Sequence, residues 1–217
     1  NRYENQDKEI YVTETSDRAF EEEVMLSGFA SAPTKQEGAG VVFDQANETF
    51  TARYTHETIA LAFAITEEAI EDNLYDRLAA RYTRALARSM SNTKQVKAAN
   101  VLNQAQFTAV TGGDGVPLIA NNHPLATGGQ FSNVLATAAD LNETSLEQSL
   151  IDISSFVDER GLKIAAQGVK MIIPKELQFT AERLMKSPQR TSTADNDINA
   201  IVSMGMVPQG YRVNNFL

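Results

Sequence analysis

The chain has 217 residues, 42% of them hydrophobic, and a net charge of -9 at pH 7. This length and composition allow a buried core and exclude a disordered protein. The absence of cysteine excludes disulfides, thiolate metal sites and cysteine nucleophiles. No apolar run reaches the roughly 18 to 20 residues that a membrane span needs, and the polar, acidic start is unlike a signal peptide. We therefore expect a soluble protein with no membrane partner.

The charge is unevenly distributed along the chain. Residues 1–76 contain 17 acidic and five basic residues, whereas residues 77–113 contain six basic residues and no acidic one. An acidic first third and a basic middle indicate that one copy of the chain could complement another. The overall negative charge makes general binding of nucleic acids a poor expectation.

Residues 1–33 are polar, include the acidic run Glu21, Glu22 and Glu23, and hold only brief apolar clusters. A segment of this composition buries too little apolar surface to form a core. We predict an extended arm that becomes ordered by lying on another surface. A floppy terminus is the alternative.

Residues 34–65 have the period-two alternation of strands. A short apolar run, Val41–Phe43, is followed by a turn-like segment, and a second run begins at Thr49 and continues to Ile65. We predict a long hairpin made of these two runs. Because an isolated hairpin is only marginally stable, it is expected to pack on its own chain or on a neighbour.

Residues 66–110 are predicted to form a long helix, since no glycine or proline occurs between Gly40 and Gly112. Thr66 is a suitable N-cap. A kink is expected at Ser89–Thr93. The heptad pattern is not kept, which favours packing on a sheet over a coiled coil. The apolar positions recur at intervals of four: Ile70, Leu74, Leu78, Tyr82, Leu86 and Met90.

Four arginines fall on one side of this helix: Arg77, Arg81, Arg84 and Arg88. We favour an acidic surface of the same or a neighbouring chain as their partner, and we treat them, with Glu21, Glu22 and Glu23, as candidates for contacts between subunits. A solvated face is one alternative. Binding of nucleic acid is another, but Tyr82 is the only aromatic residue interleaved with them.

Residues 111–217 are predicted to form an α/β unit that opens with a glycine-rich loop region. A phosphate-binding loop would need a following Lys-Ser/Thr and a helix start, which this region lacks. Beyond it we predict, in order, a helix with a capping box at Thr144–Glu147 that ends at Gly161, a strand over Val169–Ile173, a helix from Pro174 to Lys186, and a short element over Ile198–Met204.

No catalytic constellation is evident. The two histidines, His56 and His123, have no recognisable motif around them and do not suggest a metal pair. We therefore predict no catalytic, cofactor-binding or metal-binding residue. An oligomeric enzyme with a site in the glycine-rich loops, around Asp114 and His123, is the competing hypothesis.

The order of arm, hairpin, long helix and loop-rich α/β unit resembles the HK97-like major capsid proteins of tailed bacteriophages. Four strings look like blocks of their head subunits: ITEEAIEDNLYDRLAARYTRALARSM, DGVPLIANNHPL, SLEQSLIDISSFVDERGLKI and VKMIIPKELQFTAERLM. The resemblance implies an α+β fold with an arm at 1–33, an extended hairpin loop at 34–65, the spine helix of a peripheral domain at 66–110, and a mainly axial domain at 111–217. Members of the family usually return to the peripheral domain with C-terminal strands, and we expect these to be missing because the sequence stops about where they should begin. The sequence also starts without Met, so we expect both ends to be trimmed.

The resemblance further implies a structural protein, not an enzyme, that assembles with itself into hexamers and pentamers of an icosahedral head shell. That shell would enclose double-stranded DNA, touched without sequence specificity on its inner face. Scaffold, portal or decoration proteins are the other expected partners, and assembly in the host cytoplasm would yield the virion capsid. No cofactor is implied. The alternative is an encapsulin-like nanocompartment shell around a protein cargo.

Overall fold

The computed structural model describes residues 5–71, 76–190 and 197–217, apart from the side chains of residues 69, 70 and 76–79. Its strands are β1 (Phe20–Leu26), β2 (Glu48–Thr55), β3 (His123–Pro124), β4 (Gln130–Phe131), β5 (Met171–Pro174) and β6 (Tyr211–Asn214). Its helices are α1 (Asp7–Ile10), α2 (Glu67–Glu71), α3 (Asp76–Asn103), α4 (Glu143–Ser154), the 3-10 turn η1 (Lys175–Leu177), α5 (Gln178–Lys186) and α6 (Ala200–Met204). Within these ranges the strands form three two-stranded sheets, of which β1–β2 and β3–β4 are antiparallel and β5–β6 is parallel.

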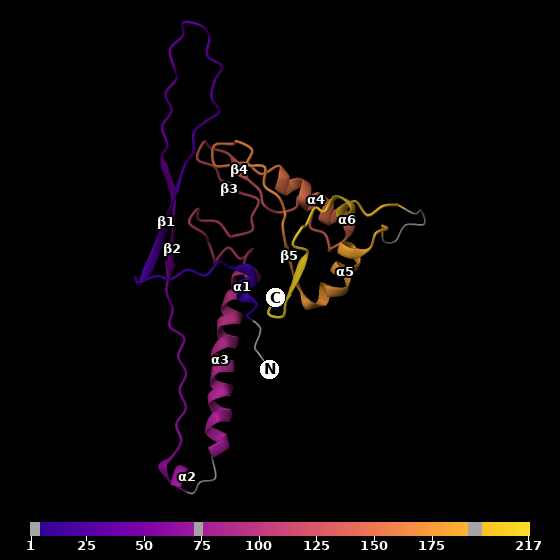
Figure 1. Cartoon of the computed structure of the whole chain (residues 1–217). Helices are drawn as coiled ribbons and strands as arrows, with labels where there is room; N and C mark the ends of the chain where they lie inside the picture. The colour runs from indigo at the N-terminus through magenta and orange to yellow at the C-terminus, as the bar shows by residue number, and fades with distance from the viewer. Residues whose placement is uncertain (1–4, 72–75, 191–196) are drawn as a thin grey trace.

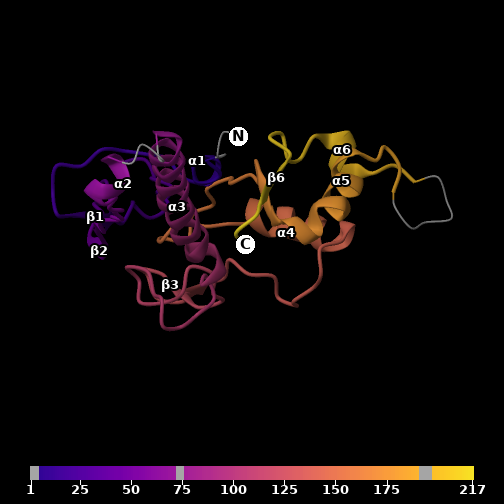
Figure 2. The same ribbon diagram turned by 90° about the horizontal axis from the view of Figure 1, so that it is seen from below.

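The elements lie side by side instead of surrounding one centre. The β1–β2 hairpin, its long loop and the extended chain that follows β2 occupy one side, α3 runs beside this extended chain, and α4, α5 and α6 lie on the other side (Figures 1 and 2). The chain exposes 16,414 Å² of accessible surface. A compact monomer of its mass, 23.7 kDa, would expose roughly 9,800 Å². A single chain therefore exposes much more surface than a compact monomer of the same mass.

The hydrophobic core lies in the C-terminal unit. Leu146 and Leu150 of α4 pack there with Ile201 of α6 and with Val207, and Met171 and Met185 border this cluster. Among the described residues, no helix combines the length and the hydrophobicity that crossing a membrane requires. The mixture of helices and strands agrees with the predicted α+β class.

The hairpin differs from the prediction. Its first strand, β1, lies in the predicted arm, whereas Val41–Phe43 belongs to the loop between the strands, and residues 56–66 are extended outside any strand. The register places Glu22 opposite Arg53, whose Nε lies 2.7 Å from the Glu22 carboxylate. The Arg53 guanidinium also lies 4.6 Å from the centre of the Phe20 ring. Such cross-strand pairs select β1 as the partner of β2, and local alternation does not reveal them.

The predicted long helix is present as α2 and α3, with residues 72–75 between them outside the described part of the chain. α3 is continuous across Ser89–Thr93, so the helix is not broken at the position of the expected kink, and the Thr93 hydroxyl donates to the Ser89 carbonyl at 3.1 Å. The side chains of Ile70, Leu74 and Leu78 lie outside the described set.

α3 lies along the extended segment 56–66 and not across a sheet, as far as the described residues go. The Tyr82 ring packs on Phe63 with centroids 5.9 Å apart, and the Lys97 ammonium pairs with Glu57 (Figure 1). Because this cover is a single chain segment, much of α3 stays exposed, including half of Tyr82.

The start of the arm lies on the other end of α3. Asp7 of α1 is buried there, where its carboxylate accepts from Gln95 Nε2 at 2.5 Å and pairs with Lys94 at 2.9 Å. Burial raises the pKa of Asp7, but the hydrogen bonds from Lys94 and Gln95 outweigh that effect and lower it. Glu9 pairs with Arg212 of β6 at 3.1 Å. α1 therefore joins α3 to the C-terminal unit.

In the C-terminal unit, the helix from Pro174 to Lys186 is confirmed as η1 followed by α5. The capping box of α4 is formed by Asn142 and Ser145, so the predicted box at Thr144–Glu147 is wrong. α4 also ends at Ser154, and Gly161, with a φ of 84°, instead closes a separate turn. The helix thus begins and ends earlier than its sequence signals indicate.

Candidate functional site

The glycine-rich loop packs against the hairpin at Gly113. A Cβ at Gly113 would lie 2.9 Å from the Thr51 carbonyl oxygen and 3.0 Å from the Ala52 nitrogen of β2. Glycine is required here because the backbone of β2 approaches too closely for a side chain. The sequence shows the Gly-Gly pair, but its role depends on a strand about 60 positions earlier in the chain.

A turn in the C-terminal unit holds both ends of the loop between β1 and β2. The largely buried Arg160 donates from Nη2 to both Asp44 carboxylate oxygens, at 2.9 and 2.7 Å. Asp44 also accepts from the Ala30 amide at 2.8 Å, and Glu159 accepts from the Gly28 amide. The Ala30 amide, and after it Arg160, lowers the pKa of Asp44. We name these contacts of Asp44 and Glu159 the loop clasp.

The loop clasp is expected to open in acid. The pKa of Asp44 is lowered from the ordinary value of 3.8, so its stabilising contribution is complete above pH 3.8 and is lost as the pH falls through the lower value of the folded chain. Hydrogen exchange of the Ala30 and Gln45 amides, which both donate to Asp44, should accelerate there relative to neutral pH after correction for intrinsic rates. The variant Asp44→Asn should exchange faster at neutral pH and show no such transition. An identical acid transition in both chains would contradict the assignment.

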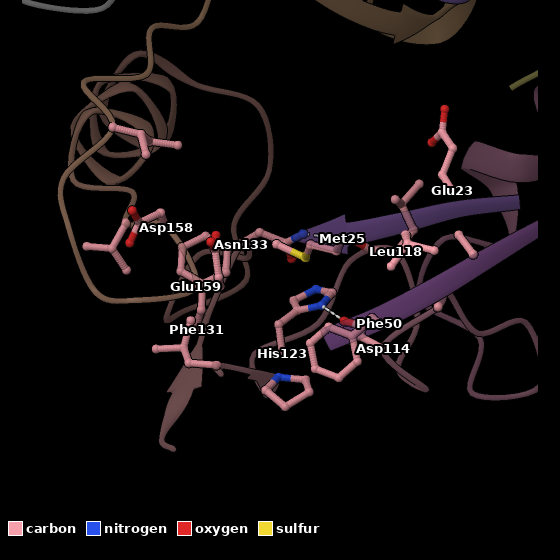
Figure 3. Close-up of a pocket in the computed structure, with 17 residues that line it drawn as sticks. Glu23, Met25, Phe50, Asp114, Leu118, His123, Phe131, Asn133, Asp158 and Glu159 are labelled. Carbon is pink, nitrogen blue, oxygen red and sulfur yellow. Dashed lines mark hydrogen bonds and ion pairs between the residues drawn. The ribbon is translucent and has the colours of Figure 1, made fainter. Parts of the chain in front are cut away.

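A cavity of about 930 Å³ lies beneath the hairpin. Its walls are mostly apolar and come from β1, β2, the glycine-rich loop and residues 157–164 (Figure 3). His123 enters this cavity with its Nδ1 2.6 Å from Asp114 Oδ2, and its ring lies against Phe131, with centroids 6.2 Å apart. The His123 Nε2 is buried without a hydrogen-bond partner in the described part of the chain.

Few kinds of reactive side chain line this cavity. The His123–Asp114 pair could transfer a proton, but none of the residues that line the cavity is a serine, threonine, lysine or cysteine. Within the described ranges, no three His, Asp or Glu side chains are grouped to hold a metal ion.

The predicted acidic contact residues lie in β1 and have partners in β2 or in the segment just before β1. Glu22 pairs with Arg53 at 2.5 Å, Glu21 accepts from the Ser16 hydroxyl at 2.5 Å, and Glu23 accepts from Tyr54 at 3.4 Å. No ion pair among the described residues joins this run to the arginines of α3. The prediction that the two sets meet between copies of the chain is therefore untested.

The predicted arginines do share one face of α3. Arg81, Arg84 and Arg88 are exposed and border a groove of about 550 Å³ with Ala85, Ser89 and Asn92. Arg77 belongs to the same helix, but its side chain lies outside the described set. In the part of the chain that the structure describes, none of the three exposed arginines forms an ion pair.

Comparison with known proteins identifies the family. Residues 48–216 match the family model described as phage capsid protein. The fold is similar to a chain of the capsid of bacteriophage JBD30 decorated with minor capsid protein trimers, with a TM-score of 0.65, 12% identity, and coverage of 100% of this chain and 96% of that one. It is also similar to a chain of the JBD30 procapsid, with a TM-score of 0.56, 14% identity, and coverage of 93% and 88%.

No curated protein matches the sequence. At 12% and 14% identity the two solved structures show a shared fold, and the match of residues 48–216 to the family model, which covers more than half of the chain, shows the family of this chain. The chain belongs to the phage capsid protein family and is a structural protein of the bacteriophage capsid.

Proposed function

We propose that the chain assembles with itself into hexamers and pentamers of an icosahedral head shell that encloses the double-stranded DNA of a tailed phage. The observation that carries the proposal is the exposed area of 16,414 Å², against roughly 9,800 Å² for a compact monomer of this mass. Burial of apolar surface drives association, so a chain with this excess is suited to be covered by neighbours. Assembly takes place in the host cytoplasm in this proposal.

The proposed subunit has an HK97-like organisation. Residues before β1 act as the arm, the hairpin from Phe20 to Thr55 with its loop acts as the extended loop, and α2 and α3 form the spine of the peripheral domain. Residues 111–217 are mainly the axial domain. This division differs from the predicted one in two places. The hairpin runs from Phe20 to Thr55 instead of over 34–65, because β1 and not Val41–Phe43 pairs with β2, and the long helix ends at Asn103 instead of at 110.

Exposed apolar side chains support contacts at distant parts of the subunit. Phe43 is 93% exposed on the long loop, with Val41 and Val42 exposed beside it. Phe179 of α5 and Met204 of α6 are exposed on the C-terminal unit. Patches that lie this far apart need several neighbours to cover them, as a shell provides and a dimer does not.

The cargo and the other partners are also part of the proposal. The family is described as that of a phage capsid protein, which favours DNA over the protein cargo of a nanocompartment. DNA would be contacted without sequence specificity on the inner face, and scaffold, portal or decoration proteins would complete the particle.

The purified, intact chain is expected to form large closed particles. Sedimentation velocity should show a fast species far larger than the 23.7 kDa subunit, and negative-stain electron microscopy should show hollow shells of uniform diameter. A subunit that stays monomeric at high concentration, with no particles in the microscope, would refute self-assembly.

A further inference from the structure

The three exposed arginines continue a row of α3 that is buried farther along the helix. Spacings of three and four residues place Arg81, Arg84, Arg88, Asn92, Gln95 and Ala99 on one side of the helix. Gln95 is 2% exposed and Ala99 is fully buried, whereas the arginines are exposed. One end of the row is thus covered within the chain and the other end is not. We name Arg81, Arg84 and Arg88 the arginine row.

The covered end shows what kind of element fits this face. α1 is a short helix with the sequence DKEI, and it docks through Asp7. The Asp7 amide donates to Gln95 Oε1 at 3.0 Å, and its carboxylate binds Gln95 and Lys94. A short acidic helix is therefore an occupant that α3 already accepts.

The uncovered end of the row carries positive charges that no carboxylate among the described residues neutralises. The arginine row rises about 10 Å along the helix and surrounds a groove of about 550 Å³. Positive charges three and four residues apart on a helix repel one another. An anionic partner in the groove would remove this repulsion, and arginine is well suited to bind carboxylates through paired hydrogen bonds.

α2 has the complementary pattern. Its sequence, EEAIE, places Glu67, Glu68 and Glu71 on one turn of helix, and these three are exposed and form no ion pair among the described residues. Glu67 and Glu71 are four residues apart, as Arg84 and Arg88 are, so both pairs have the same rise of about 6 Å. Two carboxylates can thus face two guanidinium groups in register.

We propose that the arginine row binds α2 of a second copy of the chain. This inference rests on the proposed self-assembly and names one of its contacts. α2 and the first turns of α3 lie at the same end of the subunit (Figure 1). A contact from α2 of one copy to the arginine row of the next is heterologous and brings these ends of neighbouring copies together, and it forms a ring where the rotation between copies closes. A protein with a net charge of -9 offers carboxylates more readily than it attracts DNA.

Charge reversal tests the pairing. Arg84→Glu/Arg88→Glu and Glu67→Lys/Glu71→Lys should each lower the yield of shells by about tenfold or more, because like charges facing each other across an interface cost several kcal/mol. The chain with all four substitutions should recover shells to within about twofold of the wild type, because the attraction is restored with its sign reversed. Shell yield is measured by sedimentation and electron microscopy.

The control Lys163→Glu/Lys175→Glu changes two exposed lysines of the C-terminal unit. It lowers the net charge by the same amount as Arg84→Glu/Arg88→Glu, and it should leave the yield near that of the wild type. The melting temperature of the unassembled subunit should be equal in all variants. Failure of the fourfold variant to recover, or an equal loss in the control, would overturn the pairing.

Two other outcomes would also overturn it. A melting temperature that falls in both double variants and returns in the fourfold variant would place the contact within one chain. Normal shells with lost DNA binding in Arg84→Glu/Arg88→Glu would assign the row to nucleic acid. A wild-type chain that forms no shell would instead refute the proposed function, so the two failures are distinguishable.

Discussion

Replacing Asn199 with alanine is expected to lower the free energy of unfolding by about 3 kcal/mol, since it removes an N-cap and leaves buried backbone groups unpaired. Asn199 is 1% exposed. Its Nδ2 donates to the Leu184 carbonyl at 2.8 Å and to the Ser187 carbonyl at 3.1 Å, and its Oδ1 accepts from the Ile201 and Val202 amides. One side chain thus joins the end of α5 to the start of α6. Urea unfolding of the unassembled subunit, followed by circular dichroism, measures the loss.

Asn199→Asp is the matched control for this change. Aspartate keeps the acceptor that caps α6 but loses both donations to the carbonyls, so its stability should fall between those of the wild type and the alanine variant. Because Ile201 belongs to the core cluster, misplacement of α6 should also expose that cluster. A destabilisation below about 0.5 kcal/mol for Asn199→Ala would show that water replaces these hydrogen bonds.

Gly113→Val is expected to displace the hairpin from the glycine-rich loop and to abolish efficient shell assembly. The added side chain would meet the Thr51 carbonyl at 2.9 Å, and backbone cannot move aside as a flexible side chain does. Overpacking of this kind costs about 1–3 kcal/mol. Hydrogen exchange should show lost protection in β2, and sedimentation should show fewer shells.

Gly115→Ala separates this effect from a general weakening of the loop. Gly115 has a φ of 81°, so alanine is strained there by about 1 kcal/mol, but nothing lies within 4 Å of the added Cβ. Its hairpin should keep wild-type protection. Unchanged exchange in β2 of Gly113→Val would show that the position of the hairpin does not depend on this contact with Gly113.

Local signals predicted the C-terminal helices well where proline sets their limits. Pro174 precedes the turn that opens α5, and Ser187-Pro188 follows its last residue. The start of α4 differs from the predicted capping box at Thr144–Glu147, because Asn142 and not Thr144 caps the helix. The helix begins after Asn142, whose side chain accepts from Ser145, and Leu146 and Leu150 then face the core.

The first strand of the hairpin could not be predicted because its pairing with β2 is not local. Glu22 and Arg53 are 31 positions apart, and the loop between their strands carries an apolar run, Val41–Phe43, that resembles a strand by itself. The arginine row was predictable from spacing alone, since helical periodicity fixes the shared face. Its partner was not, because no acidic side chain of the described chain reaches it.

The position of α1 bears on the curvature of a shell. Asp7 is fixed to α3, while Gln6 and Glu9 hold the end of β6 through the Asn215 amide and Arg212. A few residues near the start of the chain therefore set the angle between the long helix and the C-terminal unit. The radius of a closed shell depends on the angle between such parts in each of its subunits. The first helix of this protein thus fixes part of the geometry on which the curvature of the proposed shell would depend.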